Sequence, residues 1–128
     1  MQVEHVAWQV PDPVATAAWY VECMGFKVVR RGKGPSLAHF LGDSSGHVII
    51  EVYNNSAASI PDYASMSPLH LHLAFAVANV AETRDRLVKA GATIAEDISI
   101  THAGDEIAML RDPWSFPVQL IKRAVPML

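Results

Sequence analysis

Two histidines, a glutamate and a glutamine stand at matching places in the two halves of this 128-residue chain. A shift of 67 residues places His5 on His72, and a shift of 68 places Glu51 on Gln119. Imidazole and carboxylate groups transfer protons and bind metal ions, whereas an amide is a neutral and weaker ligand. What these four residues do depends on the elements that carry them.

The first half of the chain has the pattern of a strand, a helix and three more strands. Residues 3–10 alternate with a period of two, which predicts a strand. Asp12 and Pro13 are typical of a helix N-cap and first helical position, and Gly25 of a helix end, so we expect a helix over residues 14–24. Further strands are predicted at residues 26–30, 37–41 and 47–53.

The second half repeats this order after a polar linker, residues 55–67. Residues 69–77 alternate again, Asn79 is a typical helix N-cap, and a helix over residues 80–90 is expected to end at Gly91. Three more strands are predicted at residues 93–100, 106–111 and 116–122. Because strand, cap, helix end and last strand recur in one order, we predict two βαβββ modules, residues 1–54 and 68–124, within a single domain.

In this arrangement the polar residues of the strands have two possible locations. Polar side chains in the middle of a curved sheet either face solvent or line a cavity. The rival ferredoxin-like βαββαβ sandwich has fewer strands and leaves no place for the strand pair between residues 37 and 53. We expect Trp8 and Phe75 to pack in the core, and His39 to lie on the surface, since nothing in its spacing indicates a role.

Composition narrows the class of protein. A net charge of -3 gives no sign of a nucleic-acid partner or an anionic membrane partner. No apolar run approaches the roughly 20 residues of a membrane span, and no signal peptide is visible. The single cysteine, Cys23, cannot form an internal disulfide. We therefore expect a cytoplasmic protein with neither a nucleic-acid nor a membrane partner.

Several segments, taken in order, resemble the vicinal-oxygen-chelate superfamily, which comprises glyoxalases, bleomycin-resistance proteins and ring-cleaving (extradiol) dioxygenases. The segments are His5-Val6-Ala7, Trp19-Tyr20, Met24-Gly25-Phe26, the run His72 to Val77, Lys89-Ala90-Gly91-Ala92, and the run Asp112 to Leu120. The resemblance covers nearly the whole chain. It implies an α+β fold in which the two modules form a curved, partly open barrel, and a homodimer in which modules are sometimes exchanged between chains.

In that family the first and last strands of each module supply the ligands of one divalent metal ion. Carried over to this chain, the ligands are His5, Glu51, His72 and Gln119, and the metal is Zn, Ni, Fe, Mn or Co. Glu51 would also be the base that removes a proton next to a carbonyl group. The resemblance therefore implies a metal-dependent lyase or isomerase that acts on a small oxygen-bearing substrate through an enolate.

Gln119 departs from the family pattern, and other functions stay open. The closing position is usually Glu in glyoxalase-like and epimerase members, and it supplies the only carboxylate in the dioxygenases. The main alternative is a metal-free protein that sequesters a small molecule, as bleomycin-resistance proteins do. A thiol transferase of the fosfomycin-resistance type is another. In the plainest alternative, His5, His72 and Glu51 are solvated strand residues.

Overall fold

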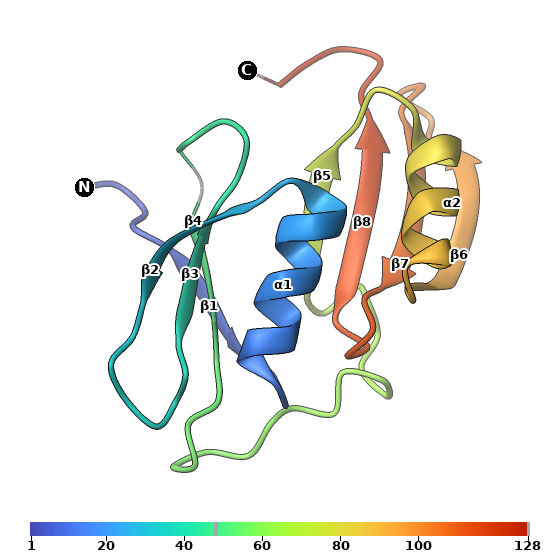
Figure 1. Ribbon diagram of the computed structural model, residues 1–128. Coiled ribbons are helices and arrows are strands. Elements are labelled where there is room, and N and C mark those ends of the chain that lie inside the picture. The colour runs from blue at the N-terminus through green and yellow to red at the C-terminus, as the bar shows by residue number, and fades with distance from the viewer. Residues whose placement is uncertain (48, 128) are drawn as a thin grey trace. The chain divides into compact units, whose positions relative to one another are not determined.

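The computed structural model describes residues 1–47 and 49–127 and has the predicted α+β fold (Figure 1). Val48, which the sequence assigns to a strand, and Leu128 lie outside the described residues. The elements are β1 (Val6–Gln9), α1 (Pro13–Met24), β2 (Lys27–Arg31), β3 (His39–Gly42), β4 (Ile49–Tyr53), β5 (Leu73–Ala76), α2 (Val80–Lys89), β6 (Thr93–Ile100), β7 (Glu106–Arg111) and β8 (Pro117–Lys122). They fall into two compact units, Met1–Pro61 and Asp62–Leu128.

Each unit is a four-stranded sheet with one helix packed against it (Figure 1). The strand orders are β1-β4-β3-β2 and β5-β8-β7-β6. In both sheets the first strand runs parallel to the last, and the other neighbours are antiparallel. The same topology in both units confirms the predicted repeat of a βαβββ order.

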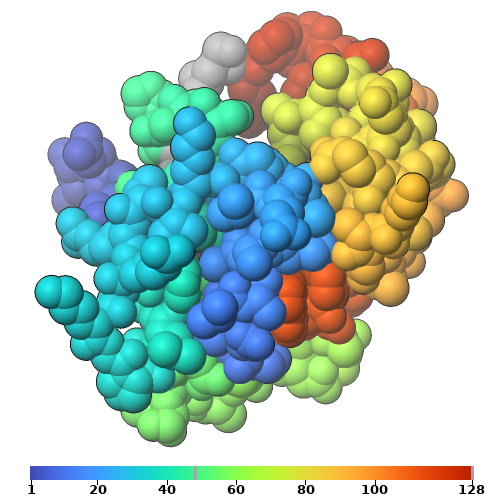
Figure 2. Space-filling view, viewed as in Figure 1, coloured from blue at the N-terminus to red at the C-terminus, as the bar shows by residue number. Residues whose placement is uncertain are grey.

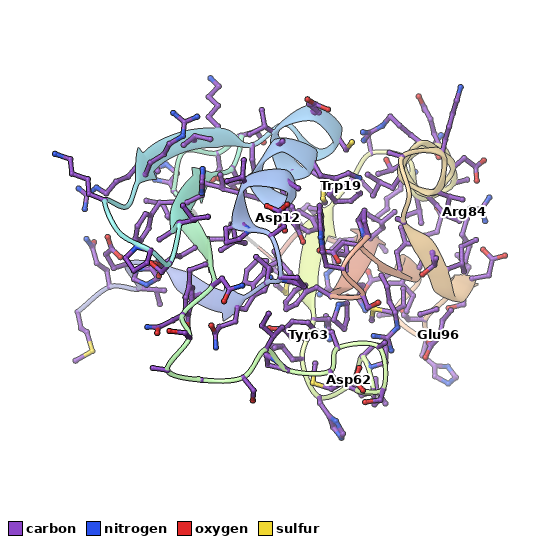
Figure 3. All side chains as sticks on the ribbon, turned by 60° about the horizontal axis from the view of Figure 1, so that its bottom comes forward. Asp12, Trp19, Asp62, Tyr63, Arg84 and Glu96 are labelled. Carbon is purple, nitrogen blue, oxygen red and sulfur yellow. The ribbon has the colours of Figure 1, made fainter. Side chains whose placement is uncertain are left out.

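The helices begin where their sequence signals predict. The Asp12 carboxylate, labelled in Figure 3, accepts hydrogen bonds from the backbone N–H groups of Val14 (3.1 Å) and Ala15 (3.0 Å). Gly25 ends α1 with a φ of 75°, in the left-handed region where a residue with a side chain is strained. The Asn79 side chain caps α2 by accepting the N–H three residues later at 3.0 Å. Neither helix among the described residues is long and apolar enough to span a membrane.

Two residues lie in surroundings that differ from those predicted, whereas Trp8 is buried in the core as predicted. Phe75 is only half-buried. His39, expected on the surface, is 8 % exposed. Its strand β3 lies inside the sheet, and it pairs with the fully buried Val52. Its Nδ1 lies 2.7 Å from the backbone oxygen of Leu37, so this burial leaves the ring nitrogen hydrogen-bonded.

The segment between the two sheets is held at each end by one polar side chain. In the first unit, Gln9 is buried, donates to the carbonyl of Ala58 (3.0 Å) and accepts the N–H of Asn55 (2.6 Å). In the second unit, Arg111 donates to the carbonyls of Tyr63 (2.5 Å) and Met66 (2.8 Å). Figure 3 shows Tyr63 on this loop. Its ring packs edge-on against Phe116, with centroids 5.2 Å apart.

Asp105 fixes the start of β7 to the end of the chain's last strand. Its carboxylate accepts the backbone N–H of Ala124 (2.9 Å) and a guanidinium N–H of Arg123 (2.6 Å), and the residue is 6 % exposed. The hydrogen bond from the backbone N–H of Ala124 is the largest cause that lowers the pKa of Asp105 below its usual value of 3.8, and the hydrogen bond from Arg123 is the second.

We therefore expect Asp105→Asn to lower the melting temperature at neutral pH. Because the folded-state pKa is depressed, the stabilisation by the carboxylate is present above about pH 4 and is lost as the pH falls through the folded pKa. Thermal unfolding followed by circular dichroism should show a constant gap between the two proteins from about pH 6 to 8, and a narrowing gap below about pH 4. The exposed Glu96→Gln substitution (Figure 3) is the charge-matched control. A gap of the same size at every pH would contradict the assignment.

Candidate metal centre

In the first unit the structure brings His5 and Glu51 together. His5 directly precedes β1, which is shorter than the predicted strand. The register pairs Ala7 of β1 with Glu51 of β4, and His5 lies two positions before Ala7. His5 Nε2 is 3.3 Å from Oε2 of Glu51, and the two side chains are 33 % and 18 % exposed. Glu51 lies between Ile50 and Val52, which are fully buried, so it belongs to the opposite face of the sheet, and its contact with His5 places the imidazole on that same face.

The imidazole of His5 is held from two further sides. Its Nδ1 forms a hydrogen bond with the carboxylate of Glu4, and its ring lies edge-on to Phe40, with centroids 5.6 Å apart. The hydrogen bond with Glu4 raises the pKa of His5 above its usual 6.5; desolvation opposes the shift, and the charges of Glu4 and Glu51 reinforce it. A metal ion that binds Nε2 must therefore compete with a proton up to a higher pH than at an ordinary histidine.

In the second unit His72 and Gln119 hold the equivalent places. His72 directly precedes β5, and the pairing of Ala74 with Gln119 repeats the pairing in the first unit. His72 is exposed, and its Nδ1 lies 2.9 Å from the backbone oxygen of Pro68. When Nδ1 donates its proton to this carbonyl, Nε2 keeps the lone pair that a metal ligand needs.

The donor set fits a divalent transition metal. Each histidine has its Nδ1 held by an oxygen, the arrangement that usually orients a metal-binding imidazole, and Nε2 is then the ligand atom. Two imidazoles, the Glu51 carboxylate and the Gln119 amide oxygen suit Zn, Ni, Fe, Mn or Co. Among residues 1–47 and 49–127, no three His, Cys, Asp or Glu side chains form one group that could hold a metal. The structure brings His5 and Glu51 into contact in the first unit, and it places His72 and Gln119 at the equivalent register positions in the second.

Sequence reasoning missed two neighbours of His5. An alternating strand over residues 3–10 would have put Glu4 and His5 on opposite faces, but β1 starts only at Val6, and Glu4 reaches the imidazole. Phe40 pairs with Glu51 across β3 and β4. The predicted hairpin would have identified Phe40 as the cross-strand partner of Glu51 only if the register of its two strands had been known.

A family model for the Glyoxalase/Bleomycin resistance protein/Dioxygenase superfamily matches residues 2–120. The chain belongs to this superfamily, which confirms the resemblance seen in the sequence.

Individual relatives point to the same family. The lactoylglutathione lyase of Salmonella typhimurium is 25 % identical over 128 residues, which cover 95 % of this chain and 93 % of the relative. A glyoxalase I mutant from Zea mays is 26 % identical with a TM-score of 0.73, over 94 % of this chain and 45 % of the maize chain. A family enzyme from Burkholderia phytofirmans PsJN has a TM-score of 0.78 at 21 % identity, over 96 % and 99 % of the two chains, which shows the shared fold.

Proposed function

We propose that the protein is a metal-dependent lyase or isomerase that acts on a small oxygen-bearing substrate through an enolate. The observation that carries this proposal is the contact of His5 Nε2 with Glu51 Oε2 at 3.3 Å, at positions equivalent to those of His72 and Gln119. The similarity to a lactoylglutathione lyase supports a reaction of this class.

In this proposal His5, Glu51, His72 and Gln119 would be the ligands of one divalent metal ion. The bound ion would polarise a substrate carbonyl and so acidify the carbon next to it. Glu51 takes up the proton from that carbon, and can return it to the neighbouring atom. Glu4 holds the His5 ring by Nδ1, so that Nε2 stays on the Glu51 side.

Gln119 leaves this site with Glu51 as its one base, where glyoxalase-like and epimerase members usually have a second carboxylate at the closing position. An amide is neutral and takes up no proton at physiological pH. All proton transfer in the proposed site therefore falls to Glu51, and Gln119 serves as a ligand or orients the substrate. The expectations of a cytoplasmic location and a homodimer stay predictions.

Metal content tests the proposal. We expect the full chain, loaded with Ni, Zn, Fe or Mn and freed of excess metal, to retain a stoichiometric amount by elemental analysis. His5→Ala should bind the same metal at least about 100-fold more weakly, since even changes to groups behind the ligands cost about 10- to 100-fold. His102→Ala removes an exposed histidine outside the site and is the matched control.

A wild-type protein that retains none of the four metals would contradict the enzyme proposal. The second candidate function, a metal-free binding protein of the bleomycin-resistance type, would then apply. It is favoured by Gln119, whose neutral amide is a weaker metal ligand than the carboxylate usual at the closing position.

A further inference from the structure

The four basic residues of the first unit all fall in β2 and the turn that follows it: Lys27, Arg30, Arg31 and Lys33. All four are exposed, and none forms an ion pair with another described residue. Figure 2 shows this segment, in cyan, on the surface of the molecule. Because β2 is an edge strand, a row of charges there prevents it from pairing with the sheet of another molecule. This role explains why basic residues gather in the segment.

Arg30 differs from Arg31 in the face of the sheet on which it lies. It pairs with Phe40, which in turn pairs with Glu51, so Arg30 lies on the same face as the candidate metal ligands. Arg31 pairs with His39, the buried residue, and belongs to the opposite face. The two arginines are adjacent in the chain, but only Arg30 lies on the face of Glu51.

A small cavity of about 190 Å³ opens beside Arg30. It is lined by Glu4, Val29, Arg30, Phe40 and Ile49. The irregular register between Val28 and Arg30 leaves Val29 unpaired. Gly42 makes room for it, since a Cβ at Gly42 would lie only 3.1 Å from a Val29 methyl.

This cavity adjoins the candidate metal ligands and has one unneutralised charge. Phe40 contacts the His5 ring, and Glu4 is hydrogen-bonded to His5. The negative charge of Glu4 is therefore already engaged, whereas Arg30 has no ion-pair partner among the described residues. An apolar floor that ends in a guanidinium suits a short hydrocarbon group carrying a carboxylate, which Arg binds through two parallel hydrogen bonds.

We propose that Arg30 binds a carboxylate of the substrate while Phe40, Val29 and Ile49 hold a short aliphatic arm. This inference rests on the proposed function for the reacting centre, and it adds that the substrate carries a carboxylate on a short aliphatic arm. The cavity is smaller than the roughly 300 to 1,000 Å³ of pockets for drug-sized ligands, so it admits only one small arm of the substrate.

Direct binding tests the subsite without any need for turnover. The probes are isovalerate and its uncharged analogue isovaleramide, titrated into the full chain, as purified and after EDTA treatment, and followed by the NMR shift of the Ile49 methyl groups. We expect wild type to bind isovalerate about 10-fold or more tightly than isovaleramide in both preparations. Arg30→Met should abolish this preference, whereas Arg31→Met, on the other face, should keep it. Phe40→Ala should weaken both probes.

Equal affinity for the two probes in wild type would overturn the inference, as would a loss of preference in Arg31→Met as large as in Arg30→Met. A preference seen in the metal-loaded protein but lost after EDTA treatment would also overturn it, because the carboxylate would then be bound by the metal. A chain that binds no metal but prefers isovalerate through Arg30 would contradict the proposed function and leave this subsite standing.

Discussion

Glu51→Gln is expected to lower the rate of substrate proton exchange by about 10²- to 10⁴-fold, the usual contribution of a positioned general base. The amide keeps the shape of the side chain but takes up no proton, and Gln119 offers no second base. Lactoylglutathione is the first substrate to try, because a lactoylglutathione lyase is among the relatives. In deuterated water, a functional base would remove the lactoyl proton next to the carbonyl, and ¹H NMR follows the loss of its signal.

Glu51 is both a ligand and a base in this proposal, so the two losses must be separated. The exchange rate should be measured at a metal concentration that saturates the Glu51→Gln variant. Glu22→Gln, an exposed residue of α1, is the control for the loss of one negative charge. If wild type exchanges the proton and Glu51→Gln does so at the same rate with metal bound, Glu51 is not the base.

Tyr20→Ala is expected to lower the free energy of unfolding by about 3–5 kcal/mol, the cost of removing a large ring from a packed core. The Tyr20 side chain has no exposed surface. Three other rings surround it, at centroid distances of 5.3 Å (Trp19), 5.7 Å (Phe26) and 6.2 Å (Trp8). Removal of Tyr20 therefore opens a cavity between α1 and the sheet that these rings cannot close without leaving their own contacts.

Urea unfolding of the full chain measures this effect. Val21→Ala, the exposed neighbour on the same helix, should change the free energy of unfolding by less than about 0.5 kcal/mol. Tyr20→Phe keeps the ring and should lose only a small part of the stability. A Tyr20→Ala variant as stable as Val21→Ala would show that the aromatic cluster does not anchor α1.

The helices show which features the sequence reveals well. The helix ends are set by Asp12, Asn79 and Gly25, which act on backbone groups only a few residues away. The sequence alone therefore predicts where the helices begin and end. The predicted strand ends were less accurate: the pattern over residues 3–10 extends beyond β1, and the pattern over residues 69–77 extends beyond β5. A strand ends where its partner strand ends, and the partner is far away in the sequence.

The sequence likewise predicted some features of the candidate site and missed others. The repeat paired His5 with His72 and Glu51 with Gln119, and the resemblance to the superfamily implied that these four residues are metal ligands. It did not show that Glu4 reaches His5. Nor did it show that Phe40 lies against the imidazole.

The sequence by itself determined the order of elements, the duplication and the superfamily, since these depend on local periodicity, caps and matching positions. Only the tertiary structure decided the partners of His5, the burial of His39, and the placement of Arg30 rather than Arg31 on the face of Glu51. The reason is register: an offset of one residue between strands turns a side chain to the other face, and pairing between distant segments sets that offset.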